Sequence, residues 1–325
     1  MTAQQPVEGE RPAAEELLPD EMATDTGHLP VSVTPADELG ATRKQIRAEQ
    51  RRVLFRSPAF IVGVIIVGFW LFSSLFPGIL TTWDPKDFVT DSDGNPLVRA
   101  SPSGDAWFGT DRVGRDVYSR VIFGARPVLI VAPIAAAISV AAGTLLGLLI
   151  GYYRGWVDEI ISRIIEGFLS VPVILLAIIV LFTFGSSRPV IIGTIAVLFT
   201  PVVTRTIRAA TLAEAQLDYV TSARMRGENG LFIISREILP NIINIIVVEL
   251  TVRLGFAIFT VATLAFLGIV AEDLTDADWG VDVAENYEQI GNDIWWPTVF
   301  PALAIASIVI AVNLIADSID KATRS

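Results

Sequence analysis

The stretch DYVTSARMRGENGLFIISREILPN, residues 218–241, decides the fold, because it separates two long apolar segments. It is too long and too apolar for the short polar turn that normally joins two membrane spans, and Gly227, Gly230 and Pro240 punctuate it. Glycine interrupts helices, and proline breaks them by removing a backbone donor. The stretch therefore predicts two short helices, broken at residues 227–230 and ended by Pro240, that form a platform against which another protein can push.

The composition indicates a membrane protein. Apolar residues make up 52% of the chain and come in blocks, which is typical of membrane spans and not of one soluble core. The sequence has no cysteine, which excludes disulfides and thiol chemistry. The single histidine, His28, lies in the polar N-terminal part, so a histidine-based metal site or triad is excluded and we expect no bound metal.

The acidity of the chain is confined to two segments. The formal net charge is −11, but residues 1–40 carry nine acids against Arg11, and residues 271–295 carry eight acids and no base. Each segment thus has a net charge of −8, and the rest of the chain carries +5. Because the acids gather in two solvent-facing pieces, the net charge does not indicate an acidic ligand, and we expect no nucleic acid partner.

Six apolar segments predict an all-α integral membrane protein with six transmembrane helices. A helix needs about 20 apolar residues to cross the hydrocarbon core. These segments are apolar on all sides, unlike amphipathic soluble helices, and proline opens several of them, where its missing N–H is not needed. The predicted spans are Pro58 to Leu80, Pro127 to Gly151, Ile160 to Phe184, Pro189 to Thr206, Ile242 to Val270, and Pro297 to Ala316.

Basic residues set the predicted orientation. The run RKQIRAEQRRVLFR, residues 43–56, abuts the first span, so the positive-inside rule places the N-terminus in the cytoplasm. An even number of spans places the C-terminus there too, together with residues 207–239, and puts residues 271–295 outside. Residues 81–126 fit less well, because they fall outside and yet carry six basic residues. We expect a multi-pass protein of the cell membrane with both termini cytoplasmic.

The chain divides into three predicted parts. Residues 1–40 lack hydrophobic periodicity and predict a disordered, acidic cytoplasmic tail. Residues 41–57 form a basic cytoplasmic lead-in, and residues 58–325 form the six-span domain. That domain contains one long cytoplasmic loop and two outer loops, at residues 207–240, 81–126 and 271–296.

The opening stretch resembles the cytoplasmic coupling loop of ABC importer permeases. In the general pattern, Glu-Ala-Ala is followed by Gly and then by Ile-x-Leu-Pro; this chain has TSA at residues 221–223 and matches the Gly to Leu-Pro spacing. Thr replaces the initial Glu of that pattern, and Glu237 replaces the Ile. The peptide-permease form, Tyr-Val-x-x-Ala-Arg-x-x-Gly with Ile-Leu-Pro-Asn, is matched by Tyr219, Val220, Ala223, Arg224, Gly227, Ile238, Leu239, Pro240 and Asn241.

Three further motifs resemble the same branch. FGTDRVGRDVYSR at residues 108–120 precedes the second span, and GYYRGWVD at residues 151–158 follows it. LAFLG at residues 264–268 with DWG at residues 278–280 resembles the outer segment after span five. Four motifs in the expected order are far more specific than one. The chain most resembles the "C" permease of dipeptide and oligopeptide importers, which implies the type I ABC importer architecture.

The resemblance implies a half-transporter that works by alternating access. Its partners would be a homologous permease in a heterodimer, two cytoplasmic ATPases, and an extracellular or lipid-anchored solute-binding protein. The sequence has no Gly-x-x-x-x-Gly-Lys-[Ser/Thr] loop, so we expect ATP and Mg on the ATPases and neither a cofactor nor catalysis on this chain. One alternative is a permease of the same class with a nickel or haem-like cargo. Another is a stand-alone secondary transporter or channel, although the two halves of this sequence show no internal repeat of the kind that such transporters often have.

The candidate coupling residues lie in the opening stretch. Apolar side chains offer contact to an ATPase, charged ones offer orientation, and Gly227 permits a tight bend. The alternative interpretation is an amphipathic segment that rests on lipid headgroups. The candidates are Asp218, Tyr219, Val220, Ala223, Arg224, Gly227, Leu231, Phe232 and Pro240.

Charged residues suggest two further sites. Glu249 and Arg253, four apart in span five, share one helical face and should avoid lipid, so they either line the passage or form an internal salt bridge. A second set has helical spacing and predicts either an outer gate or binding-protein contact, or a self-paired surface helix. Its members are Asp111, Arg112, Arg115 and Asp116.

Small and aromatic residues give the remaining expectations. Glycines at 143, 147 and 151 predict a helix-packing seam, because small residues at that spacing let helices approach closely. Pro172 predicts a kink in span three. The acids of residues 271–295 are expected to solvate that loop, and Trp295 and Trp296 to lie at the membrane interface.

Overall fold

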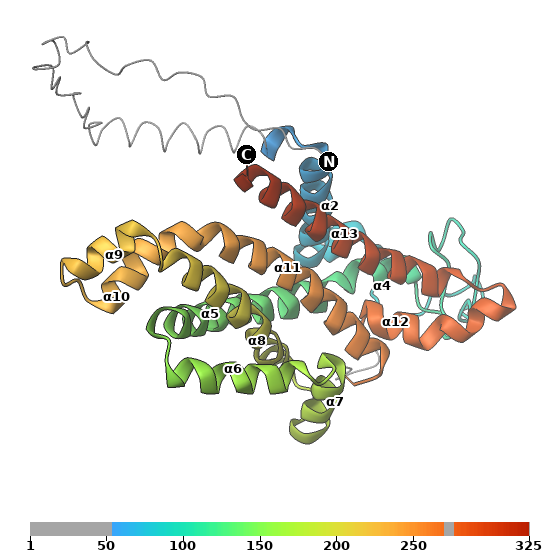
Figure 1. Cartoon of the computed structure of the whole chain (residues 1–325). Helices are drawn as coiled ribbons and strands as arrows, with labels where there is room; N and C mark the ends of the chain where they lie inside the picture. The colour runs from blue at the N-terminus through green and yellow to red at the C-terminus, as the bar shows by residue number, and fades with distance from the viewer. Residues whose placement is uncertain (1–53, 270–275, 325) are drawn as a thin grey trace, which may run out of the picture. The chain divides into compact units, whose positions relative to one another are not determined.

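The computed structural model describes residues 54–269 and 276–324, and this part of the chain is helical, with isolated β-bridges and no β-strand among those residues (Figure 1). The all-α prediction is confirmed. The predicted tail, residues 1–40, and most of the basic lead-in, residues 41–57, lie outside the described residues, so those expectations stay predictions.

The helices follow the apolar segments of the sequence. In chain order they are α2 Pro58–Leu75, α3 Pro77–Leu80, α4 Val117–Phe123, α5 Ala125–Tyr153, α6 Trp156–Leu169, α7 Val173–Phe184, α8 Arg188–Glu214, α9 Asp218–Met225, α10 Gly230–Phe232, the π-helix η1 Ile233–Ile238, α11 Leu239–Phe266, α12 Trp279–Asn286, the 3₁₀-helix η2 Tyr287–Asn292, and α13 Trp296–Arg324.

Five stretches of the described chain are long and apolar enough to cross a membrane, or six if α6 and α7 together form one span. The five are Pro58–Leu75, Val117–Tyr153, Arg188–Glu214, Gly230–Phe266 and Trp296–Ala322. Most predicted spans begin later or end earlier than the helices do. Helices α8 and α11, for example, extend into polar sequence, which an apolar pattern does not detect. Predicted span one is also interrupted, because α2 ends before Phe76 and α3 restarts at Pro77.

The third predicted span is a broken pair and not one kinked helix. Helices α6 and α7 meet at an angle of 89°. Pro172 is the N-cap of α7, and the residue before a proline is disfavoured in the α-helical conformation. The bend predicted at Pro172 is therefore present, but it is a break and not a kink within one helix: Ser170 caps α6, Val171 lies between the helices, and the chain turns sharply.

The predicted glycine seam is confirmed between α5 and α8, which form the most extensive helix contact of the structure. A Cβ added at Gly147 would lie 2.8 Å from Ile207 Cβ and 2.9 Å from Thr204 O. Gly143 and Gly151 meet Val203 and Thr211 equally closely, at Cβ distances of 2.6 and 2.8 Å. The small residues let the two backbones touch, and this holds α5 and α8 as one unit.

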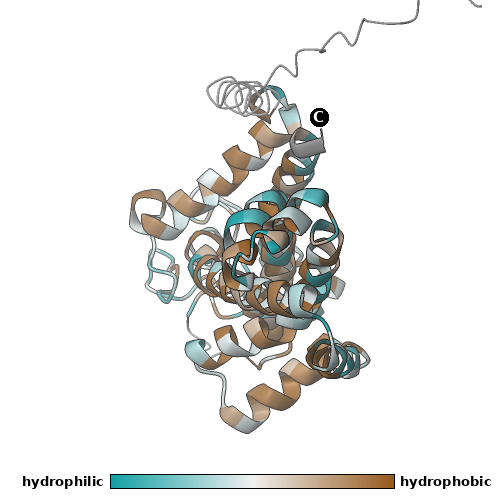
Figure 2. Ribbon diagram, turned by 60° about the vertical axis from the view of Figure 1, so that its left-hand side comes forward, coloured by the Kyte–Doolittle hydropathy of each residue, from teal (hydrophilic) through white to brown (hydrophobic). Residues whose placement is uncertain are grey.

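Two apolar clusters form the core. The larger joins α2, α5, α8, α11 and α13 around Trp279. The smaller lies at the end of the bundle that carries α9 and α10, here called the α9 end; the end that carries α12 is the α12 end. Large apolar side chains also remain exposed, such as Ile65 and Phe182, and Figure 2 shows hydrophobic residues along the outer helices. Exposed apolar surface on helices is what a membrane-spanning protein presents to lipid.

The seam predicts a size-sensitive contact. We expect Gly147→Ala to lower the free energy of unfolding by about 1–3 kcal/mol, because its Cβ overpacks against backbone that cannot move away. The measurement is the thermal unfolding midpoint of the purified chain in detergent. Gly193→Ala in α8 is the matched control, since nothing lies within 4 Å of its added Cβ. Equal midpoints for the two variants would contradict the seam.

Candidate functional site

The segment that joins α8 to α11, residues 215–238 and here called the connecting segment, is anchored to the bundle by apolar contacts. Val220 and Ala223 of α9 are fully buried and pack in the smaller core with Ile233 and Ile238 of η1. Between α9 and α10 the chain turns at Gly227, whose φ of +77° is a conformation that favours glycine. The predicted break at residues 227–230 is confirmed, and the segment is a rooted element of the structure.

The second half of the segment differs from the prediction. Pro240 does not end a short helix; it lies in the first turn of α11, and helix continues from Gly230 to Phe266. Proline is tolerated there because no α-helical N–H bond is required of it. The π-helix before it makes wider turns, so that the N–H of Leu239 donates to Ile234 O. The chain thus passes from the connecting segment into α11 without a hinge.

Tyr219 links three helices at this end. Its hydroxyl donates to Glu214 at the end of α8 and accepts from Asn241 Nδ2 of α11 at 2.9 Å. Burial, followed by the bond to Glu214, raises the pKa of Tyr219 to about 12, so the phenol stays neutral at physiological pH. The sequence marked Tyr219 as an apolar contact. Tyr219 and Asn241 both belong to the quoted motif, but a motif does not show that two of its residues meet, and Glu214 lies outside it.

The exposed face of the connecting segment carries the other predicted residues. Leu231 and Phe232 are exposed, as are Leu217 and Met225 beside them. Asp218 is exposed in the first turn of α9, where a carboxylate suits the helix dipole. The expectation that Val220 offers apolar contact to a partner is wrong, because its side chain is buried in the bundle; Val220 and Ala223 anchor the segment instead.

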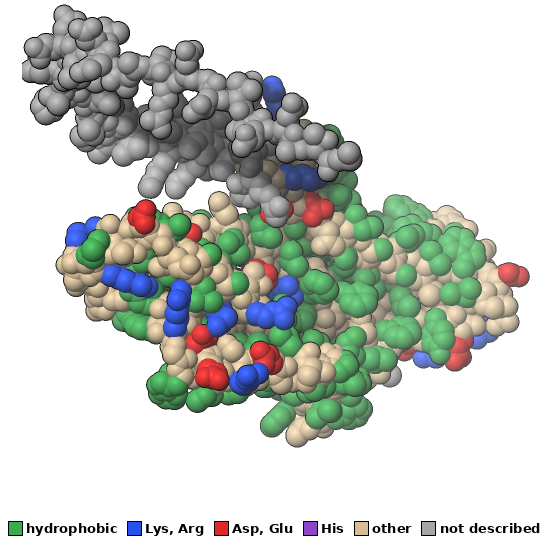
Figure 3. All heavy atoms as spheres, in the orientation of Figure 1, with side chains coloured by type: hydrophobic (Ala, Val, Ile, Leu, Met, Phe, Trp, Pro, Cys, Tyr) green, Lys and Arg blue, Asp and Glu red, His purple; other side chains and the backbone are tan. Residues whose placement is uncertain are grey.

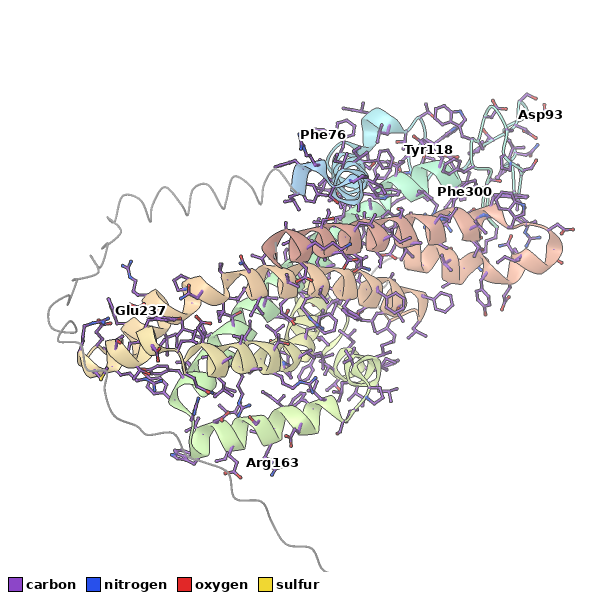
Figure 4. All side chains as sticks on the ribbon, turned by 45° about the horizontal axis from the view of Figure 1, so that its top comes forward. Phe76, Asp93, Tyr118, Arg163, Glu237 and Phe300 are labelled. Carbon is purple, nitrogen blue, oxygen red and sulfur yellow. The ribbon has the colours of Figure 1, made fainter. Side chains whose placement is uncertain are left out.

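Arginines brace this end against its neighbours. The guanidinium of Arg224 lies 4.8 Å from the ring centre of Tyr152, at the end of α5. Arg208 of α8 binds Asp158 of α6 with two hydrogen bonds, Nε to Oδ1 at 2.5 Å and Nη2 to Oδ2 at 2.7 Å. Figure 3 shows basic side chains over the α6, α8 and α9 part of this face. In Figure 4, Glu237 lies at the α9 end and Tyr118 and Phe300 lie toward the other end.

The α12 end is held together by buried ion pairs. Arg120, 2% exposed, donates from Nε to Asp282 Oδ1 at 2.7 Å, across 162 positions of sequence. Its other nitrogens donate to the carbonyls of Pro85 at 3.2 Å and Asp276 at 3.1 Å. Burial raises the pKa of Asp282 to about 6, and the charge of Arg120 opposes that rise. This arginine joins α4, the loop before it, and α12.

A second cluster lies beside it. Arg115 pairs with Asp111 Oδ2 through Nε at 2.6 Å and with Glu285 Oε2 through Nη2 at 2.6 Å. Burial and these two carboxylates act oppositely on Arg115, and the net effect raises its pKa. Asp116 caps α4 by accepting from the N–H of Ser119 at 2.8 Å. Arg112 reaches Glu285 at 3.2 Å and is the one half-exposed member.

The structure corrects two expectations about this end in part. The self-pairing that was the alternative for residues 111–116 is present between Arg115 and Asp111, but the helix is not. Residues 108–115 form a turn and not a surface helix, because Asp111 Oδ1 accepts three backbone N–H groups, those of Val113, Gly114 and Arg115, each at 2.9 Å.

Of the acids expected to solvate residues 271–295, Glu288 and Asp293 are exposed, and Glu272 and Asp273 lie outside the described residues. The acids Asp278, Asp282 and Glu285 do not solvate a loop; they cap α12 or neutralise arginines.

Tryptophans close the same region. Trp279 is fully buried and donates to Val121 O at 2.7 Å, and its ring meets Trp70 with centres 4.7 Å apart. Trp296 is also buried and donates to Thr110 O at 3.0 Å, so its ring packs inside the chain, while Trp295 is exposed; their position at the membrane interface stays a prediction. The DWG motif is thus a packing element.

Glu249 and Arg253 of α11 form the salt bridge that their spacing allowed, with Nε and Oε2 3.1 Å apart. Both side chains are mostly buried, and the guanidinium lies 5.2 Å from the ring centre of Phe256. A paired and partly buried charge costs less in an apolar layer than an isolated one. The part that this pair plays in lining a passage stays a prediction.

Long apolar helices, an anchored connecting segment at one end and a buried charge cluster at the other define a multi-pass membrane permease. The chain belongs to the family of binding-protein-dependent transport system inner membrane components, whose family model matches residues 143–325. It is therefore a membrane subunit of an ABC transport system, which works with ATPase subunits and a binding protein.

Curated relatives cover most of the chain. The glutathione transport system permease protein GsiD of Pectobacterium atrosepticum is 34% identical over 83% of this chain and 86% of its own length. The dipeptide transport system permease protein DppC of Alkalihalophilus pseudofirmus is 32% identical over 89% of this chain and 92% of its own. GsiD of Escherichia coli O6:K15:H31 is 36% identical over 84% and 86%. The resemblance to the peptide branch is confirmed.

The buried arginine makes a stability prediction. We expect Arg120→Leu to cost about 3–5 kcal/mol of unfolding free energy, because it leaves Asp282 buried without the arginine that it is bonded to. Arg112→Leu, at the half-exposed pair, should cost less than about 1 kcal/mol. Unfolding midpoints of both variants in detergent at pH 8 give the comparison.

The pH dependence of the Arg120→Leu variant has a defined sign. In the folded chain, burial raises the pKa of Asp282 to about 6, from 3.8 in the unfolded chain. Between these two pH values the native state therefore binds more protons than the unfolded state. Stability from this group therefore rises as pH falls through that range, and protonation relieves the uncompensated charge. The variant should recover more stability from pH 8 to pH 5 than the unmodified chain does. If Arg120→Leu lost no more stability at pH 8 than Arg112→Leu, the bonds of Arg120 would not be what holds this end together.

Proposed function

We propose that this chain is one of two homologous permease subunits of an ATP-driven importer for short peptides, and that it forms half of the translocation pathway. The cargo follows from the relatives, whose printed names specify dipeptide and glutathione transport. The single observation that carries the mechanism is the connecting segment, which is anchored by buried side chains, is continuous with α11, and exposes apolar side chains, among them Leu231 and Phe232.

The orientation is part of the proposal. The α9 end, with its exposed arginines, lies in the cytoplasm, because short basic loops are retained there. The α12 end then faces outward, where a solute-binding protein, extracellular or lipid-anchored, delivers the cargo. In this arrangement both chain termini lie on the cytoplasmic side.

The coupling contact is made by exposed apolar residues of the connecting segment. Leu231 and Phe232 enter a cleft of the ATPase, and Asp218 and Arg224 orient the segment by charge. ATP and Mg bind to the ATPases and not to this chain. Because apolar anchors in a pocket dominate most interfaces, the two apolar residues supply most of the affinity.

Movement passes from the contact to the membrane as a rigid-body motion. When the ATPases close on ATP, the connecting segment moves with them, and α11 follows because no hinge separates the two. The seam between α5 and α8 and the bond between Arg208 and Asp158 carry α6 along. The helices then reorient about a central pathway, on which the pair Glu249 and Arg253 lies.

The turn at Gly227 tests this mechanism. We expect Gly227→Val to leave membrane insertion intact and to lower peptide uptake per ATP hydrolysed by about tenfold or more, because a β-branched residue resists φ +77° and the turn must change. Gly227→Asn is the matched control: asparagine tolerates the left-handed region, and nothing lies within 4 Å of the added Cβ.

The measurement is uptake of a labelled dipeptide and ATP hydrolysis by the complete complex in proteoliposomes. The complex with Gly227→Asn should import as much dipeptide per ATP hydrolysed as the unmodified complex does. Coupled uptake at the normal ratio in the Val variant would refute a coupling role for the turn, and uptake by this chain alone without ATP would refute the importer.

A further inference from the structure

A cavity of about 480 Å³ lies at the α12 end of the described structure. Its lining comes from the loop before α4, the end of α4, the starts of α5 and α8, α11, and α12 with its lead-in. This volume falls in the range of about 300–1,000 Å³ that small-molecule pockets occupy. The apolar part of the lining is formed by Phe123, Ile130, Val131, Ile191, Val261 and Val281.

Charged side chains of both signs complete the lining. Arg126 and Arg188 come from the first turns of α5 and α8, and Asp84 and Asp276 come from the loop before α4 and the lead-in to α12. Lys86 is paired with Asp276 at 2.6 Å. A cavity with an apolar lining and charges of both signs suits a small zwitterion that also carries apolar groups.

Among the charged lining residues, Arg126 has N–H donors that are not used within the described residues. Its side chain forms no ion pair or hydrogen bond with any residue in the two described stretches, 54–269 and 276–324. A guanidinium has five N–H donors in a planar fork that matches a carboxylate. An arginine on the cavity wall that has no partner among residues 54–269 and 276–324 therefore favours a ligand that brings its own carboxylate.

The hydrogen bonds of the buried Arg120 hold the walls of the cavity in place. Arg120 donates to the carbonyls of Pro85 and Asp276, which are both lining residues of the cavity. Asp278, also in the lining, accepts from the N–H of Gly280 at 2.8 Å and so fixes the lead-in to α12. A site whose walls are already hydrogen-bonded loses less entropy when a ligand binds.

We propose that this cavity binds a short peptide through its free α-carboxylate, with Arg126 as the carboxylate-binding residue and Arg188 beside it. The apolar lining takes a peptide side chain, and Asp84 faces the amino group. The inference rests on the proposed peptide import and adds to it where this chain first holds the cargo. It also makes the free carboxylate a requirement imposed by the permease itself.

The test uses the complete complex in proteoliposomes with ATP and its binding protein, and trialanine as the probe. We expect Arg126→Gln to lower trialanine uptake about tenfold, the size of one lost charge-assisted contact, while ATP hydrolysis stimulated by loaded binding protein persists. Arg126→Lys should restore part of the uptake. Arg99→Gln, an exposed arginine outside the cavity, is the matched control and should leave uptake unchanged.

A capture experiment locates the peptide independently of these variants. With photoreactive benzoylphenylalanine at Ile130, which lines the cavity, illumination should attach labelled trialanine to the chain, and excess trialanine should block this better than trialanine amide. The same group at exposed Phe88 should capture none. Absent capture at Ile130, equal blocking by the amide, or normal uptake by Arg126→Gln would each overturn the cavity proposal.

The two proposals fail in different ways. If the unmodified complex imports no peptide with ATP, the proposed function fails before the cavity is tested. If it imports trialanine and Arg126→Gln does so equally well, only the cavity proposal fails. Loss of stimulated ATP hydrolysis together with uptake in Arg126→Gln would also count against it, because it would assign Arg126 to assembly and not to the peptide.

Discussion

The continuity of helix from Gly230 to Phe266 is the constraint on which the rest of the account depends. A proline at position 240 would normally separate a surface helix from a membrane span, and a separated helix could swing without moving the span. Because Pro240 falls in the first turn of α11, directly behind a π-helical stretch, the helix continues past it even though proline has no N–H to donate. The buried contacts of Val220 and Ala223 then tie α9 to the same body.

The two ends of the bundle use charge in opposite ways. At the α9 end, arginines such as Arg224 are exposed and available to a partner or to headgroups. At the α12 end, Arg115 and Arg120 are buried against carboxylates, so a basic segment there carries little net field. This explains how six basic residues are compatible with an outward position in the proposed orientation.

The sequence predicted the helices well and their ends and contacts less well. Apolar length predicts a span directly, and spacing predicted the glycine seam and the bond between Glu249 and Arg253, because both depend on one helix geometry. The same residue type gave opposite outcomes at Pro172 and Pro240, since the neighbouring turns decide whether a helix bends or continues. The bond from Arg120 to Asp282 spans too much sequence for any local pattern to reveal.

The central claim, that the connecting segment and α11 move as one body, can be measured directly by electron–electron spin distances. The chain has no cysteine, so spin labels on Met225→Cys and Phe256→Cys, both at exposed positions, are unique in this subunit. In the complete complex the account predicts one narrow distance distribution that is the same without nucleotide and with ATP bound. A shifted distance or a second population in the ATP-bound state would contradict it, because it would place a hinge between the segment and the helix.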